Sequence, residues 1–371
     1  MKVTPSLVIR EDIQALSAYH VQQAAGMIKL DAMENPYPLP ESLQMEIAHR
    51  ISRIGVNRYP DPSAPILQGL LRDCMAIPQD TGILLGNGSD ELLQIMLTAC
   101  AKPGAVVMTP SPGFVMYRMY SLYLGLKFVE LPLEADFTLD AGKFITAMRE
   151  VAPAVVFIAY PNNPTGNSFP DEDLVSIIRE APGLVVIDEA YQPFARGSFL
   201  TRIHDFPNLV VLRTLSKLGL AGIRLGYAVG DPGWIAQFDK VRSPYNVNAL
   251  TQCFGECVLE RYPILLDQAD LIRAGRADLM GKLGEIPGVT TFPSDANFLM
   301  IRVPDASKVF GALKSRGILV KNLDGAHPIL RNCLRITVGS GAENVALLSA
   351  MAEILVGAGA GDGGTRSSGV R

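Results

Sequence analysis

Short apolar runs alternate with longer helix-like segments through the first two thirds of the chain. We expect these runs to form strands at 83–85, 105–108, 127–131, 154–159, 184–187, 209–213 and 225–229. Helices are expected at 90–99 and from Pro170 onward, where a proline followed by acidic residues is favourable for a first turn. Alternating strands and helices are typical of a mostly parallel sheet that helices cover on both faces. The pattern therefore predicts an α/β fold with a mostly parallel mixed sheet.

The order of predicted helices and strands changes after Val241. The segment 249–286 reads as helical, and strands at 297–301 and 333–338 flank a helix at 307–316. This pattern predicts a second, smaller α+β domain. We expect residues 51–242 to form the large domain and 243–356 the small one, with 1–50 joining the small domain. Residues 357–371 are rich in glycine and lack apolar groups to bury, so we expect a disordered tail.

Composition and charge indicate which classes of protein the chain fits. The chain has 371 residues and 48% hydrophobic residues, enough for more than one core. Its net charge of −4 is spread over interspersed acids and bases, which predicts no nucleic-acid or anionic-membrane partner. The first residues carry charge where a signal peptide is apolar, and no run reaches the ~18 apolar residues of a membrane span, so we expect a cytoplasmic protein. Five cysteines without a Cys-x-x-Cys pair and four separated histidines favour reduced thiols and no metal site.

Three polar clusters follow predicted strands: Asn-Asn-Pro-Thr-Gly at 162–166, Asp-Glu-Ala-Tyr at 188–191 and Arg-Thr-Leu-Ser-Lys at 213–217. Lys217 lies on a turn of small residues, where a neutral amine could form an imine with an aldehyde. Taken alone, the motif fits a solvated surface lysine better. Asp188 ends an apolar strand, where open α/β sheets bind ligands, although strand-end acids often only cap a loop.

A glycine-rich turn, Gly-Asn-Gly-Ser-Asp-Glu at 86–91, leads from a strand into a helix. The free N–H groups and partial positive charge of a helix start suit a phosphate, although serine and aspartate are also ordinary caps. Phe114 is the candidate for stacking on a bound ring, and a core phenylalanine is the simpler interpretation.

Taken together, these motifs resemble the pyridoxal 5'-phosphate (PLP)-dependent aminotransferases of the aspartate aminotransferase superfamily. With Glu-Asn-Pro-Tyr at 34–37, Arg-Tyr-Pro at 58–60 and Leu-Arg-Ile-Thr-Val-Gly at 334–339, the chain is most similar to histidinol-phosphate aminotransferases. The similarity runs from about residue 31 to 355. It implies fold type I, with a large PLP-binding domain and a smaller α+β domain.

The resemblance also implies roles for single residues. Lys217 would bind the cofactor covalently, and Asp188 would pair with its pyridine nitrogen. Tyr191 and Asn163 would contact the ring hydroxyl. The remaining cofactor contacts implied are the ring-stacking Phe114 and the phosphate ligands Ser89, Asp90, Thr214, Ser216 and Arg224.

Substrate contacts and assembly are implied in the same way. Tyr37 would lie at the substrate mouth, and Asn163 would also bind substrate. Arg335 would bind the α-carboxylate of glutamate and, in the other half-reaction, the phosphate arm of histidinol phosphate. Tyr59 would reach the cofactor phosphate of a partner subunit, which makes the protein a homodimer with shared active sites. The implied reaction transfers an amino group between histidinol phosphate and 2-oxoglutarate.

Alternatives share most of these residues. One is another aminotransferase of aromatic or broad specificity, and another is a PLP-dependent amino-acid phosphate decarboxylase on the same scaffold. A regulatory module is disfavoured, since we expect no DNA-binding domain before residue 31 and the sequence has no basic stretch. The chain also departs from many relatives by having one residue fewer between Lys217 and Arg224, and by Pro112-Gly113 before Phe114.

Overall fold

The computed structural model describes residues 3–18 and 22–359, and its larger sheet has the strand order β2-β8-β7-β6-β5-β3-β4. All neighbours pair in parallel except at β8, which runs antiparallel to both β2 and β7. The prediction of a mostly parallel mixed sheet is therefore confirmed. Its strands are β2 (Gly82–Asn87), β3 (Val106–Ser111), β4 (Lys127–Pro132), β5 (Val155–Ala159), β6 (Leu184–Asp188), β7 (Leu209–Thr214) and β8 (Leu225–Gly230).

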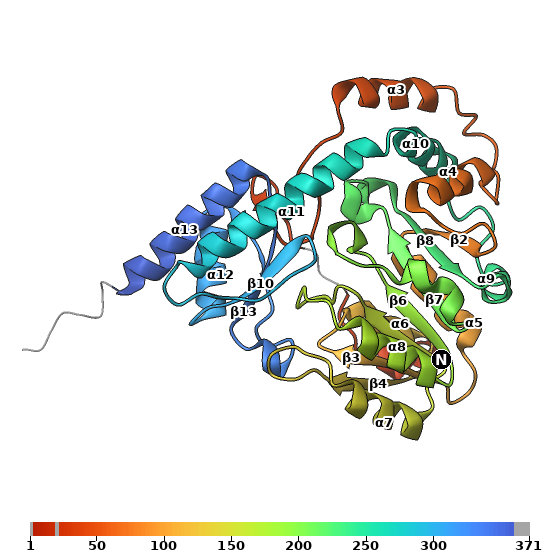
Figure 1. The fold of residues 1–371 in the computed structure, drawn as a ribbon, viewed down its shortest axis with the longest axis horizontal. Helices are drawn as coiled ribbons and strands as arrows, with labels where there is room; N and C mark the ends of the chain where they lie inside the picture. The colour runs from red at the N-terminus through yellow and green to blue at the C-terminus, as the bar shows by residue number, and fades with distance from the viewer. Residues whose placement is uncertain (1–2, 19–21, 360–371) are drawn as a thin grey trace, which may run out of the picture.

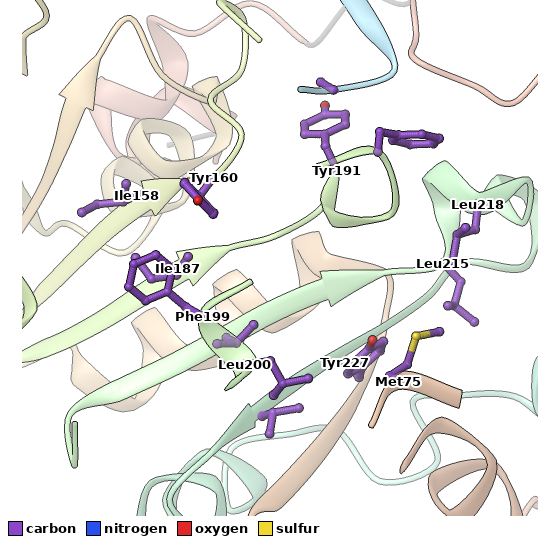
Figure 2. Close-up of a cluster of buried hydrophobic side chains, with 14 of the residues drawn as sticks. Met75, Ile158, Tyr160, Ile187, Tyr191, Phe199, Leu200, Leu215, Leu218 and Tyr227 are labelled. Atoms are coloured by element: carbon purple, nitrogen blue, oxygen red, sulfur yellow. The ribbon is translucent and has the colours of Figure 1, made fainter. Parts of the chain in front are cut away.

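Successive residues of the central strands enter two different cores, because strand side chains alternate between faces. Val155 and Phe157 pack with α5 and α9 on one face, whereas Val156 and Ile158 join the core on the other. Figure 2 shows part of this second core, with Ile158 and Ile187 of neighbouring strands beside Phe199. The helices around the sheet are α4 (Pro65–Met75), α5 (Ser89–Cys100), α6 (Val115–Tyr123), α7 (Ala141–Val151), α8 (Asp171–Glu180) and α9 (Pro232–Asp239).

A smaller antiparallel sheet, with strand order β12-β13-β10-β9, lies to one side of the larger sheet (Figure 1). The helices α11, α12 and α13 pack on it around a separate core that includes Leu279, Leu299 and Leu347. Figure 1 shows α11 extending from this unit to the neighbourhood of α10. The elements are β9 (Thr290–Thr291), β10 (Phe298–Arg302), β11 (Ile318–Leu319), β12 (Lys321–Asn322), β13 (Cys333–Thr337), α10 (Ala249–Leu259), α11 (Pro263–Gly284), α12 (Ala306–Ser315) and α13 (Gly341–Gly359).

The N-terminal part contacts both units. After the short helices α1 (Pro5–Val8) and α2 (Glu11–Gln14), β1 (Ile28–Lys29) pairs in parallel with β11, while α3 (Glu41–Ile51) packs against α10. The division of the chain at residues 50 and 242 stays a prediction.

The structure differs from the expectations in three local details. The helical region 249–286 is broken into α10 and α11, because Pro263 lacks the N–H that a continuous helix would use. Pro170 caps α8 rather than lying inside it. Of the expected tail, residues 357–359 are the last turn of α13, and 360–371 lie outside the described residues.

Three further features concern the described residues as a whole. None of the described helices combines the length and apolar composition needed to cross a bilayer. All five cysteines fall in the described residues and are free. Among those residues, no cluster of three or more potential ligands is arranged to hold a metal ion.

Candidate active site

The carboxyl ends of the parallel strands lead into one cavity of about 90 Å³. Because β2, β3, β5, β6 and β7 point the same way, the residues that follow them meet at one edge of the sheet. The lining residues are Met33, Ser89, Asp90, Phe114, Ala159, Asn163, Asp188, Ala190, Tyr191, Thr214, Ser216, Lys217 and Arg224. The cavity thus collects every cofactor-binding residue expected from the sequence except Tyr59.

Lys217 lies in η3 (Ser216–Leu218), directly after β7. Gly219 ends this turn with a φ of 101°, a conformation that favours glycine. The Lys217 Nζ donates to the backbone oxygen of Ala32 at 3.2 Å. Burial lowers the pKa of this amine to about 8, and the charge of Arg335 acts in the same direction. A larger fraction of the amine is therefore neutral near pH 7 than for an ordinary lysine.

Asp188 is the last residue of β6, and its side chain is buried. Burial raises the pKa of its carboxyl to about 6. Hydrogen bonds from Tyr117 and the Ala190 N–H act in the opposite direction and lower this pKa. The Tyr117 hydroxyl donates to Asp188 Oδ2 at 2.7 Å, and the Ala190 N–H donates to Oδ1 at 3.1 Å. The carboxylate is therefore held from two sides at the base of the cavity.

Tyr191 and Asn163 line the cavity, and Arg335, which does not line it, joins them in a chain of hydrogen bonds. Asn163 Nδ2 donates to the Tyr191 hydroxyl at 3.1 Å, and Arg335 Nη1 donates to Asn163 Oδ1 at 2.6 Å. Arg335 Nη2 also donates to the backbone oxygen of Asp31 at 3.0 Å. Figure 2 shows Tyr191 on the turn that follows β6. Arg335, which β13 contributes, is thus joined to residues of the larger sheet.

Hydroxyls and a guanidinium gather at another side of the cavity. The Thr214 and Ser216 hydroxyls lie 2.9 Å apart, and Arg224 Nη2 lies 3.4 Å from Asp90 Oδ2. Arg224 approaches the turn closely: a Cβ at Gly88 would lie 2.5 Å from its Nη2. Despite the shorter connection from Lys217, Arg224 therefore reaches the cavity. Asp90 places an anionic side chain here, so an anion would be bound by the backbone N–H groups at the start of α5 rather than by this carboxylate.

Besides Arg335, two more expected residues do not line the cavity. Tyr37 packs at the margin of the core, with its N–H bonded to Asn35 Oδ1 at 2.8 Å, and does not line the cavity. Tyr59 is 80% exposed, and its ring stacks on Tyr245 with centroids 4.4 Å apart. Its predicted contact with a partner subunit is not tested by a single chain.

Sequence reasoning missed several residues of this region. Met33, Ala159 and Ala190 line the cavity, and the backbone oxygens of Ala32 and Asp31 accept hydrogen bonds from Lys217 and Arg335. Met33 adjoins the motif at 34–37, Ala190 lies inside the motif at 188–191, and Ala159 ends the expected strand 154–159. These positions are the signal that could have found them.

Comparison with known proteins places the chain in a family. The model of the aminotransferase class I and II family matches residues 25–351. The chain belongs to the class I and II aminotransferases. Within this family, its curated relatives are histidinol-phosphate aminotransferases.

Two of these relatives span nearly the whole chain. Histidinol-phosphate aminotransferase 2 of Cupriavidus pinatubonensis is 52% identical over 95% of this chain and 99% of its own length. The Burkholderia pseudomallei enzyme of the same name is 53% identical over 94% of this chain and 98% of its own. Among solved structures, the Sinorhizobium meliloti histidinol-phosphate aminotransferase in complex with PLP has a TM-score of 0.84 at 26% identity, covering 95% of this chain and 98% of that one. This aminotransferase therefore has the PLP-transferase type I fold.

Proposed function

We propose that this aminotransferase binds PLP and transfers an amino group between histidinol phosphate and 2-oxoglutarate, giving imidazole-acetol phosphate and glutamate. The observation that carries the proposal is that the Lys217 amine and the Asp188 carboxylate line the same cavity, although Asp188 ends β6 and Lys217 follows β7. The identity of 52–53% to named histidinol-phosphate aminotransferases supports the choice of substrate.

The residues present fit the cofactor. Asp188 offers a buried carboxylate, suited to a protonated pyridine nitrogen, and Lys217 offers an amine with a lowered pKa. The hydroxyls of Thr214 and Ser216, the guanidinium of Arg224 and the N–H groups at the start of α5 suit its phosphate. Phe114 also lines the cavity, where its ring can cover a face of the pyridine ring.

When bound, PLP supplies an aldehyde for the amino group and a ring that delocalises negative charge from the substrate α carbon. Lys217 Nζ is the group that would take the proton from that carbon and return it, because its neutral amine is accessible near pH 7. Arg335 would bind the carboxylate of glutamate through the guanidinium that now contacts Asn163 and Asp31. Arg335 is buried, and an ion pair in a buried site is stronger than one at the surface.

A homodimer with shared active sites is part of the proposal. Tyr59 lies outside its own cavity and is 80% exposed, and Val56 nearby is 76% exposed. Exposed aromatic and apolar side chains of this kind are typical of protein interfaces. We infer that Tyr59 reaches the phosphate site of a second copy of this chain.

The decisive experiment measures both products. Purified protein loaded with PLP is incubated with histidinol phosphate and 2-oxoglutarate, and glutamate and imidazole-acetol phosphate are quantified. Equal amounts of the two products are expected. Absence of glutamate above a no-enzyme control would overturn the proposal.

The same preparation separates the alternatives. An aminotransferase of different specificity would show a higher kcat/KM with an aromatic or aliphatic amino donor than with histidinol phosphate. A decarboxylase would release carbon dioxide from an amino-acid phosphate without forming a keto product. We expect histidinol phosphate to give the highest kcat/KM and no carbon dioxide to be released.

A further inference from the structure

Tyr117 lies behind Asp188, outside the residues that line the cavity. It is fully buried in α6, and its hydroxyl donates to Asp188 Oδ2 at 2.7 Å. Its ring is stacked on Phe157, with centroids 4.8 Å apart and an interplanar angle of 7°. The edge of Phe114 meets it at 5.5 Å and 85°. Tyr117 therefore contacts two residues that face the proposed cofactor without facing it itself.

The hydrogen bond favours one charge state of Asp188. A carboxylate in an apolar site tends to take up a proton, and a hydroxyl that donates to it stabilises the ionised form. Tyr117 is suited to remain a donor, because burial and the nearby Asp188 charge raise the pKa of its phenol well above the usual range. The Ala190 N–H occupies one lone pair of Oδ1, so each oxygen retains a lone pair for a further donor.

We propose that Tyr117 is a positioning residue that keeps Asp188 ionised and aimed so that the bound proton resides on the pyridine nitrogen of the cofactor. The inference rests on the proposed function, because it concerns the PLP site of that proposal. Simple core packing would require the ring of Tyr117 but not its hydroxyl. The 2.7 Å bond to a buried carboxylate is the feature that packing leaves unexplained.

The first test is Tyr117→Phe, which keeps the stacked ring and removes the donor. PLP labelled with ¹⁵N at the pyridine nitrogen reports the position of the proton through its NMR chemical shift. We expect a protonated nitrogen in the wild type and a shift toward the unprotonated value in the variant. We also expect the Kd for PLP to rise roughly tenfold, the equivalent of about one pKa unit at Asp188.

Tyr160→Phe is the matched control. The Tyr160 side chain is also buried, and its hydroxyl bonds to a different carboxylate, Asp171 Oδ1, at 2.6 Å. This variant should leave the ¹⁵N shift and the Kd for PLP unchanged. An unchanged shift and Kd in Tyr117→Phe would overturn the inference.

A second pair of variants separates the loss of the hydrogen-bond donor from an effect on folding. 4-Aminophenylalanine and 4-methylphenylalanine at position 117 fill the space of the hydroxyl with and without a donor. The amino form should keep the wild-type ¹⁵N shift, and the methyl form should lose it. Equal behaviour of the two would overturn the role of Tyr117. Failure of the wild type to bind PLP would instead overturn the proposed function.

Discussion

At the scale of single residues, burial sets the charge states in the cavity. The pKa of Lys217 is lowered and that of Asp188 is raised for the same physical reason, since an apolar surrounding disfavours either charge. Titratable groups with opposite shifts in one cavity are typical of a catalytic site.

Replacing the amine tests its role directly. Lys217→Ala should lower kcat by at least about 10³-fold, because Lys217 is the only lysine among the described residues that line the cavity. Turnover is measured as glutamate formed from histidinol phosphate and 2-oxoglutarate. Lys240→Ala, which changes a lysine whose amine bonds to Gln237 outside the cavity, should retain wild-type kcat. Substantial turnover by Lys217→Ala would exclude the role given to this residue.

Asp188 makes the stability of the cofactor-free protein depend on pH. The pKa of its carboxyl is about 6 in the folded chain and has a reference value of 3.8. Between these values the folded state binds more protons than the unfolded state, so the contribution of Asp188 to stability falls as pH rises and is lost above about pH 6.

Urea denaturation measures this effect. From pH 5 to pH 7, the free energy of unfolding of the wild type should fall by roughly 1 kcal/mol relative to Asp188→Asn. Asp278→Asn is the control, because it removes the same kind of carboxylate from a surface ion pair with Lys282. A difference between wild type and Asp188→Asn that rises with pH would contradict the assigned shift.

At the scale of elements, the glycines determine how closely strands approach the start of α5. A Cβ at Gly226 of β8 would lie 2.6 Å from the Ser89 backbone nitrogen and 2.7 Å from the Gly88 carbonyl carbon. Neither backbone atom can move without shifting the proposed phosphate site. The turn at 86–91 is therefore positioned by the strand beside it as well as by its own sequence.

Gly226→Ala should disturb both stability and cofactor binding. We expect a loss of about 1–3 kcal/mol in the free energy of unfolding, together with weaker binding of PLP. Gly69→Ala is the control, because its added Cβ meets no atom within 4 Å and alanine favours a helix. Urea denaturation and PLP titration measure the two effects. Wild-type PLP affinity in Gly226→Ala would show that the close approach does not shape the site.

At the scale of the whole molecule, the proposed dimer distributes one active site over two chains. Lys217 lines the cavity of its own chain, whereas Tyr59 is exposed on the surface. A closed two-fold dimer would let each chain supply its Tyr59 to the other.

Mixed dimers test this arrangement. Lys217→Ala and Tyr59→Ala each impair both sites of a homodimer. In a heterodimer of the two variants, one site receives an intact Lys217 and an intact Tyr59. Co-expressed chains with different affinity tags should therefore recover activity at about one site per dimer. Activity no greater than the average of the two homodimers would contradict shared sites.

The sequence by itself determined the strands of the larger sheet and the local motifs at their ends, because apolar runs and turn residues act over a few positions. It also located Lys217, Asp188, Tyr191 and Asn163, since each belongs to a short motif after a strand.

Only the tertiary structure decided which distant groups meet. The bond between Tyr117 and Asp188 joins residues 71 positions apart, and that between Lys217 and Ala32 joins residues 185 apart. Charge states in the cavity follow from burial, and burial is a property of the folded chain rather than of any short segment.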